Sequence, residues 1–269
     1  MRGSSRAAVL EGRASFETAL TSGDPAVMAD ELFAVAELLD GNPTLRRSAA
    51  DPSREGKDKS DLITRLLHGK VSNETVAVAS VLVGQRWAQE RDLTDTIERF
   101  AVESLLKGAE DGGAIDQVED ELFRFERVVA GNPELRDALA NRLGDPAGKA
   151  ELVGGLLQGK ARPETIRLAR QSVLAPRGRR FDRAIESYLD VAADRRQQLT
   201  AVVTTAVDLT DEQRTRLAGA LQQIYSKPVL LQVVLDEEVI GGIRVQIGDE
   251  VVDGTVLRRL DEAKRHLAG

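Results

Sequence analysis

The sequence predicts a mainly α-helical protein with a small α+β domain at its C-terminal end. Two observations support this prediction. A segment of about fifty residues with apolar residues at helical spacing occurs twice, and after Leu199 the pattern changes to short runs rich in Val and Thr. We expect two tandem helical bundles, one a duplicate of the other, followed by a domain of order β-α-β-β-α. The expected domains are residues 1–107, 114–198 and 199–269.

The duplication appears when residues 29–80 are placed above residues 119–170 without a gap, at an offset of 90. Nineteen of the 52 positions are then identical, against roughly three expected from average residue usage. The longest matches are Asp30-Glu31-Leu32-Phe33 with Asp120-Glu121-Leu122-Phe123, and Gly41-Asn42-Pro43 with Gly131-Asn132-Pro133. This self-similarity indicates that one helical unit was duplicated.

Glycine and proline predict where the helices of each copy end and begin. Gly41 and Gly131 follow amphipathic runs, so we expect each of them to end a helix in the left-handed conformation. Pro43 and Pro133 follow in the first position of the next helix, where proline is favoured. The helix that carries Leu66-Leu67 should end at Gly69, and its counterpart at Gly159.

Three further helices flank the copies. Arg6–Leu20 and Leu93–Lys107 complete the first bundle, and Phe181–Gln198 repeats the pattern of Leu93–Lys107. The second bundle either has a first helix of its own or shares Leu93–Lys107, and the sequence leaves both possibilities open.

The C-terminal segment combines strands with helices. We expect strands at Thr200–Val207, Val229–Leu235 and Val239–Ile247, with a short strand at Val251-Val252. Gly241-Gly242 would lie inside the third strand and mark a bulge or a close backbone approach. A capping box, Thr210-Asp211-Glu212-Gln213, opens a helix to about Tyr225. A final helix carries Val256, Leu260, Ala263 and Leu267.

No group of residues predicts catalysis, a cofactor or a metal site. The chain has no Cys and two His, which lie apart at His68 and His266. Gly154–Ala161 is one residue short of a phosphate-binding loop, but it closes a helix instead of opening one, so we interpret it as a helix end. A net charge of −7 disfavours nucleic acid as a partner. The longest apolar runs are far too short to span a membrane, and the absence of Cys suits a reducing cytoplasm.

Two other features have a structural and a binding interpretation. Arg177, Arg179, Arg180 and Arg183 form the densest basic run, but over residues 177–196 six positive charges meet four negative ones. A solvated helix face with salt bridges is therefore favoured over a phosphate- or lipid-binding patch. The single Trp, Trp87, is interpreted as a partly buried cap on the first bundle, with an interface anchor as the alternative.

Three segments resemble a known family. Asn42 to Lys70 and its copy Asn132 to Lys160 resemble the helical domain of the delta subunit of F-type ATP synthases, called the oligomycin-sensitivity-conferring protein in mitochondria. Val233 to Gly254, with its Gly pair, alternating strand and Asp-Gly turn, is similar to the C-terminal signature of that family. The usual family member has one helical bundle, so the duplication is a departure that leaves open which bundle binds the catalytic head.

The resemblance implies a non-catalytic stator subunit of a proton-translocating ATP synthase. Its partners would be the N-terminal helices of alpha subunits in the catalytic head and the b-subunit peripheral stalk. It would lie at the cytoplasmic face of the cell membrane, held through the complex without inserting into the membrane itself. Residues expected to hold the stalk are Ile240, Gly241, Gly242, Ile243, Val256 and Leu260. The alternative is a helical-repeat scaffold unrelated to ATP synthase, and a third reading as an enzyme finds no support in the residues.

Overall fold

The computed structural model describes residues 3–141, 143–195, 199–225, 229–236, 239, 241–248 and 250–254. It confirms the predicted fold class, a mainly helical chain followed by a small α+β unit. The chain divides into two compact units, Met1–Ala192 and Ala193–Gly269. Each unit has its own apolar core. The expected division of the helical part into domains 1–107 and 114–198 stays a prediction.

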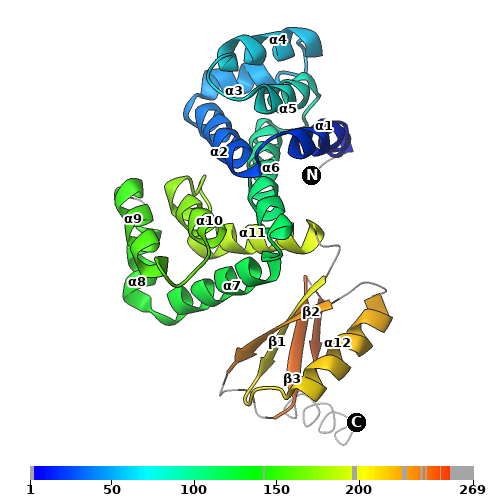
Figure 1. Cartoon of the computed structure of the whole chain (residues 1–269), viewed down its shortest axis with the longest axis vertical. Coiled ribbons are helices and arrows are strands. Elements are labelled where there is room, and N and C mark those ends of the chain that lie inside the picture. The colour runs from blue at the N-terminus through cyan, green and yellow to red at the C-terminus, as the bar shows by residue number, and fades with distance from the viewer. Residues whose placement is uncertain are drawn as a thin grey trace, which may run out of the picture. The chain divides into compact units, whose positions relative to one another are not determined.

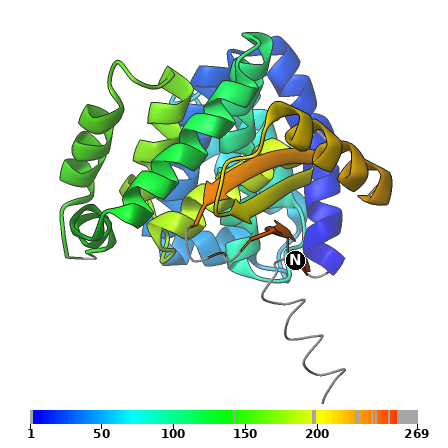
Figure 2. The same cartoon turned by 90° about the horizontal axis from the view of Figure 1, so that it is seen from below.

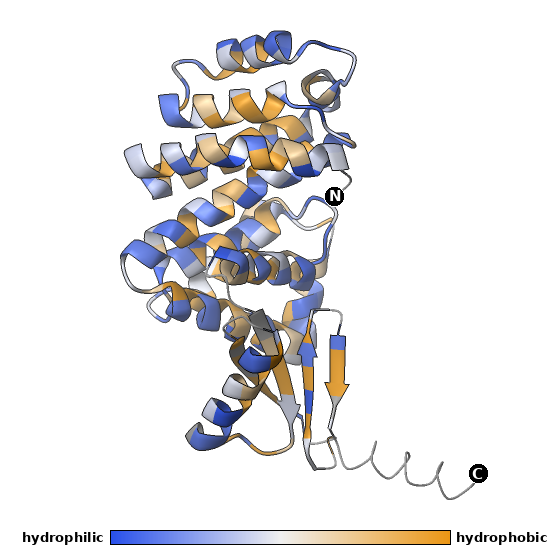
Figure 3. Cartoon of the chain, turned by 90° about the vertical axis from the view of Figure 1, so that its right-hand side faces the viewer, coloured by the Kyte–Doolittle hydropathy of each residue, from blue (hydrophilic) through white to orange (hydrophobic). Residues whose placement is uncertain are grey.

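The helices of the first unit repeat one pattern twice. The first copy contains α1 (Gly3–Ser22), α2 (Pro25–Gly41), α3 (Pro43–Ala50), α4 (Gly56–Leu67) and α5 (Asn73–Gly84). The second copy contains α7 (Ile115–Gly131), α8 (Pro133–Ala140), α9 (Pro146–Leu157), α10 (Pro163–Leu174) and α11 (Phe181–Arg195). In this unit, apolar residues lie mainly on the sides of the helices that face one another (Figure 3).

One long helix, α6 (Glu90–Asp111), joins the two copies and is part of both (Figure 1). It packs along α2 and against α1 of the first copy, and also against α7 and α10 of the second. Nearly every side of α6 is therefore buried. The buried residues include polar ones such as Glu98 and Glu103. Of the two possibilities that the sequence left open, the structure has the shared helix. Both copies consequently contribute to one continuous core.

The matched Asp-Glu-Leu-Phe segments have a structural role in both copies. Glu31 on α2 accepts hydrogen bonds from the backbone N–H of Ser72 at 2.8 Å and from the Thr75 hydroxyl at 2.6 Å. In the second copy, Glu121 accepts from the N–H of Arg162 at 2.8 Å and from the Thr165 hydroxyl at 2.6 Å. Each glutamate thus satisfies free donors at the start of α5 or α10 and fixes that helix against α2 or α7.

The helix ends confirm most of the predicted punctuation. Pro43 and Pro133 begin their helices, and Gly69 and Gly159 follow theirs with φ of 71° and 72°. The left-handed caps expected at Gly41 and Gly131 are wrong. These glycines are the last helical residues, without a positive φ, and the chain turns at Asn42 and Asn132 with φ of −124° and −118°. Because the two asparagines have a negative φ that any residue can adopt, the turn needs no glycine.

The second unit is a four-stranded mixed sheet with a helix on one face (Figure 2). Its elements are β1 (Leu199–Thr205), α12 (Asp211–Tyr225), β2 (Val229–Leu235), β3 (Ile243–Ile247) and β4 (Glu250–Asp253). The strand order is β2-β1-β3-β4, with β1 parallel to β2 and antiparallel to β3. Thr210 and Gln213 cap α12 reciprocally, as the capping box predicts. The expected final helix lies outside the described residues.

Candidate functional site

A groove between α1 and α5 is the candidate binding site of the first copy. It has a volume of about 480 Å³ and is open to solvent. Its lining comes from the C-terminal half of α1 and the first turns of α5: Ala14, Ser15, Thr18, Ala19, Ser22, Asn73, Glu74 and Ala77. Most of these side chains are small, so a partner backbone could approach the groove closely.

The spacing on α1 produces one face of small residues. Ala14, Thr18 and Ser22 are exposed and follow one another at intervals of four, so they lie one above the other on the helix surface. The opposite side of α1 is buried through Ala8, Gly12 and other residues. A single amphipathic helix therefore carries both the packing face and the groove face.

Close packing beneath the groove fixes α1 in place. A Cβ atom on Gly12 would clash with the Leu82 side chain of α5, so glycine permits the two helices to approach. Phe16 stacks on Phe100 of α6 with ring centroids 4.2 Å apart. Arg13 adds an ion pair with Glu103, with Nη2 3.0 Å from Oε1. These contacts make the groove wall a rigid part of the core.

Trp87 lies at the other end of α5. Its side chain is buried, and its indole N–H donates to the carbonyl of Leu82 at 2.8 Å. Trp87 therefore belongs to the first bundle, as the cap interpretation predicts, but it is fully buried and not partly buried as expected. Burial leaves little of the ring for a partner, so the interface-anchor alternative is not supported.

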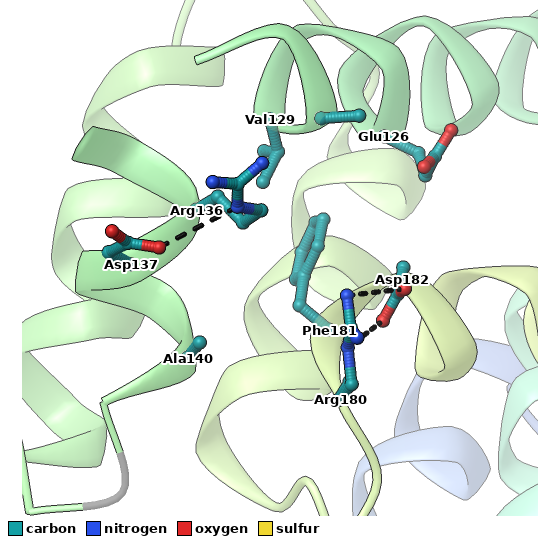
Figure 4. A pocket seen from close by; sticks show the side chains of 9 residues that line it. Glu126, Val129, Arg136, Asp137, Ala140, Arg180, Phe181 and Asp182 are labelled. Carbon is teal, nitrogen blue, oxygen red and sulfur yellow. Dashed lines mark hydrogen bonds and ion pairs between the residues drawn. The ribbon is translucent and has the colours of Figure 1, made fainter. Parts of the chain in front are cut away.

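A second cavity, of about 490 Å³, lies between α7, α8 and the start of α11 (Figure 4). Phe181 and Val129 line it together with charged residues. The charges on its wall pair with one another, as Arg136 does with Asp137 and Arg180 with Asp182. Burial raises the pKa of Glu126, and the nearby carboxylates Glu186 and Asp182 raise it further against the effect of Arg127. The cavity thus combines apolar lining with paired charges.

Two arginines of the basic run, Arg177 and Arg179, lie in an ion-pair cluster around Glu98. The other two, Arg180 and Arg183, lie on a solvated face. Arg180 and Arg183 form exposed ion pairs, as expected. For Arg177 and Arg179 the prediction of a solvated helix face is wrong, because both precede α11 and bind Glu98 on α6. The side chain of Arg177 is only 4% exposed, and its backbone has a φ of 52°. The charges in the sequence do not reveal the burial of Arg177, because that burial depends on contacts between the two copies.

Neighbouring carboxylates explain how the charge of Arg177 tolerates burial. Arg177 also pairs with Asp40 and Asp95. Burial acts to lower the pKa of Arg177, but Glu98, Asp95 and Asp40 outweigh it and raise the pKa above its ordinary value. The arginine therefore stays charged and links α2 to α6.

The predicted stalk-holding residues are only partly described. Gly241 and Gly242 have φ of 64° and 79° and precede β3, which begins at Ile243. The prediction that the Gly pair lies inside a strand is therefore wrong, because a positive φ suits a turn and not an extended strand. Ile240, Val256 and Leu260 lie outside the described residues, so the joint role of the six residues stays a prediction.

The described residues contain neither a metal-binding cluster nor a membrane-spanning helix. In that part of the chain, no group of three or more His, Asp or Glu side chains is placed to hold a metal ion. No helix among those residues is both long and apolar enough to cross a bilayer. Gly154 and Gly155 lie in α9, and Gly159 follows its end, which confirms the helix-end interpretation of the near phosphate-loop pattern.

Comparison with known proteins identifies a family twice in this chain. The model of the family described as ATP synthase delta (OSCP) subunit matches residues 12–103 and again residues 97–267. A protein named ATP synthase subunit delta from Kineococcus radiotolerans is 46% identical over 91% of this chain and 89% of its own length. One of the same name from Streptomyces griseus is 44% identical over the full length of both chains. The two matched ranges overlap within α6, the helix shared by both copies.

Proposed function

This chain belongs to the ATP synthase delta (OSCP) family, and we propose that its α1–α5 groove binds the N-terminal helix of an alpha subunit. The chain is a peripheral stalk subunit of an F-type ATP synthase. A subunit in this position connects the catalytic head to the stalk, so that rotor torque drives ATP synthesis instead of turning the head. Identity of 44% along the whole chain disfavours the alternative of an unrelated helical scaffold.

The open groove is the observation that supports the alpha-subunit end of this connection. An amphipathic helix binds a groove through apolar anchors at i, i+3, i+4 and i+7. The exposed Ala14 and Ala77 lie on opposite walls, one on α1 and one on α5. Because the side chains of both walls are small, the groove has room for larger apolar side chains of the partner helix. The rigid packing beneath the walls reduces the entropy lost on binding.

The C-terminal unit is proposed to hold the b-subunit stalk. The stalk-holding residues are Ile240, Gly241, Gly242, Ile243, Val256 and Leu260. The chain itself has no catalytic role in this proposal, since a stator needs affinity and stiffness and not perturbed catalytic groups. It lies at the cytoplasmic face of the membrane, held there through the complex.

The two ends of the connection can be tested separately because each unit has its own core. A chain ending at Gln198 is expected to bind a peptide of the alpha-subunit N-terminal helix and to lose binding to the b-subunit stalk. Undiminished stalk binding by this shortened chain would contradict the assignment of the C-terminal unit.

The groove is tested by filling it. Ala14→Arg places a long charged side chain in the groove and is expected to weaken binding of the alpha peptide by at least about tenfold, since it costs more than about 1.4 kcal/mol. Val128→Arg, which changes an exposed residue of α7, is the matched control and should leave the affinity unchanged. Equal affinities of both variants and the original chain would exclude the groove as the binding site.

A further inference from the structure

The groove that is open in the first copy has a counterpart in the second. At the offset of 90, α1 and α5 correspond to α6 and α10, so Ala14 corresponds to Ser104 and Ala77 to Arg167. Ala14 is exposed, whereas Ser104 is completely buried. Thr18 is exposed, whereas its counterpart Gly108 is partly buried. The counterpart groove is therefore covered.

Helix α2 of the same chain is the element that covers it. The Nε of Arg167 on α10 lies 2.6 Å from Oδ1 of Asp30, and its guanidinium stands 5.7 Å from the ring centre of Phe33. Gln171, one turn further along α10, donates to Glu37 at 3.2 Å. At the α6 wall, a Cβ on Gly108 would lie 3.9 Å from Cβ of Pro25, the first residue of α2. Contacts thus follow α2 from its start past its middle.

The contacts form one stripe along α2. Asp30, Phe33 and Glu37 recur at intervals of three and four, which places them on one face of the helix. Asp40 extends this stripe by three residues and binds Arg177, with Nε 3.0 Å from Oδ2. Phe33 is the apolar member of this stripe, and the three acidic side chains fix the helix to the second copy through polar contacts.

The composition of α2 fits this second contact, and that of its counterpart α7 does not. Phe33 and Ala36 are 2% and 3% exposed. In α7 the corresponding residues are Phe123, which is partly exposed, and Glu126, which carries a charge. Helix α2 therefore has one buried face that packs in its own copy and a second that packs against the second copy. Helix α7 has no such second apolar face.

We infer that the second copy's groove is permanently filled by α2, so that each chain offers a single groove for a partner helix. The second copy then lengthens the subunit and does not supply a second binding site for the catalytic head. Filling the groove from within joins the two copies through one core, which suits a part that transmits torque. Only the identity of the partner helix rests on the proposed function.

Cysteine labelling tests the closure without any partner, because the chain has no Cys of its own. Ala14→Cys should react rapidly with a maleimide in the folded protein. Ser104→Cys, which is nearly isosteric, should react at least about tenfold more slowly, since its thiol reacts only after local opening. In urea both should react equally. Equal rates in the folded protein would overturn the inference.

Binding stoichiometry tests the consequence. The full chain should bind one alpha-subunit N-terminal peptide in a calorimetric titration, and Ala77→Arg should abolish that binding. Arg167→Ala, the mirror change in the second copy, should leave one site of unchanged affinity. Two peptides bound per chain, or one still bound by Ala77→Arg, would overturn the inference. If the original chain binds no peptide, the proposed alpha partner is wrong, while the labelling rates still decide whether α2 closes the groove.

Discussion

Arg177 and Glu98, 79 positions apart in the chain, form an ion pair with Nη1 2.9 Å from Oε2. The two side chains are 4% and 5% exposed. Arg179 and the hydroxyl of Tyr188 bind the other oxygen of Glu98. One carboxylate on α6 therefore holds the loop before α11 and α11 itself, and through Arg177 it is linked to α2. This cluster is the polar counterpart of the shared apolar core.

Glu98→Ala is expected to lower the free energy of unfolding of the helical unit by about 3–5 kcal/mol, because it removes the buried carboxylate that pairs with both Arg177 and Arg179. The measurement is urea unfolding followed by fluorescence of Trp87, the single Trp, which is buried in this unit. Glu186→Ala removes a carboxylate from the exposed pair with Arg183 and should cost less than about 1 kcal/mol. Equal costs would show that the buried cluster contributes nothing beyond a surface pair.

The fold could be predicted from local signals to a large extent. The duplicated Gly-Asn-Pro segments place a helix break correctly, and the capping box at Thr210 is observed as expected. These features depend on residues a few positions apart. The wrong predictions, at Gly41 and at Gly241-Gly242, concern which backbone conformation a glycine adopts. Its neighbours in sequence do not determine that conformation.

The candidate site could not be predicted, because it depends on contacts between distant segments. Ala14 and Thr18 are unremarkable small residues until α5 is placed beside them. Likewise, the burial of Arg177 requires α2 and α6 to meet the loop before α11. One signal was present in the sequence. Ala36 of α2 corresponds to Glu126 of α7, and this difference indicates that the first copy's helix is fully buried on a face that is only partly buried in the second copy.

The glutamates that fix α5 and α10 should contribute similarly in the two copies. Glu31→Ala and Glu121→Ala each remove a carboxylate that accepts hydrogen bonds from the start of a helix, so we expect each to cost about 1.5–3 kcal/mol of unfolding free energy. Asp120→Ala, which breaks an exposed pair with Arg124, is the control and should cost less than about 1 kcal/mol. A negligible cost at Glu31 together with a large one at Glu121 would contradict a shared role.

Tyr188 should make the helical unit sensitive to alkaline pH. Burial raises the pKa of Tyr188 far above its ordinary value of 10.0, and the neighbouring Glu98 raises it further, against the smaller effects of Arg179 and Arg177. Below pH 10 the phenol is neutral in both states, so its contribution to stability is fully present. Above pH 10 only the unfolded chain loses the proton, and stability falls by about 1.4 kcal/mol per pH unit.

Tyr188→Phe should remove this dependence, so that the stability difference between the original chain and the variant shrinks as pH rises above 10. Urea unfolding followed by Trp87 fluorescence at pH 8 to 11 measures it. Tyr225→Phe changes the other tyrosine of the chain, which belongs to the C-terminal unit, and should leave the Trp87 transition unaffected. A pH-independent difference for Tyr188→Phe would mean that the phenol ionises equally in both states.

Two glycines four positions apart should respond oppositely to the same substitution. Gly155 lies within α9 with nothing within 4 Å of an added Cβ, so Gly155→Ala should stabilise the helical unit by about 0.5–1 kcal/mol. Gly159 also has open space around it, but its φ is 72°. Gly159→Ala should therefore destabilise the unit by about 1–2 kcal/mol through backbone strain alone. Urea unfolding of both variants, with Gly69→Ala as the first-copy equivalent of Gly159→Ala, measures the difference. Shifts of the same sign at positions 155 and 159 would show that the backbone conformation of the cap is not what selects glycine there.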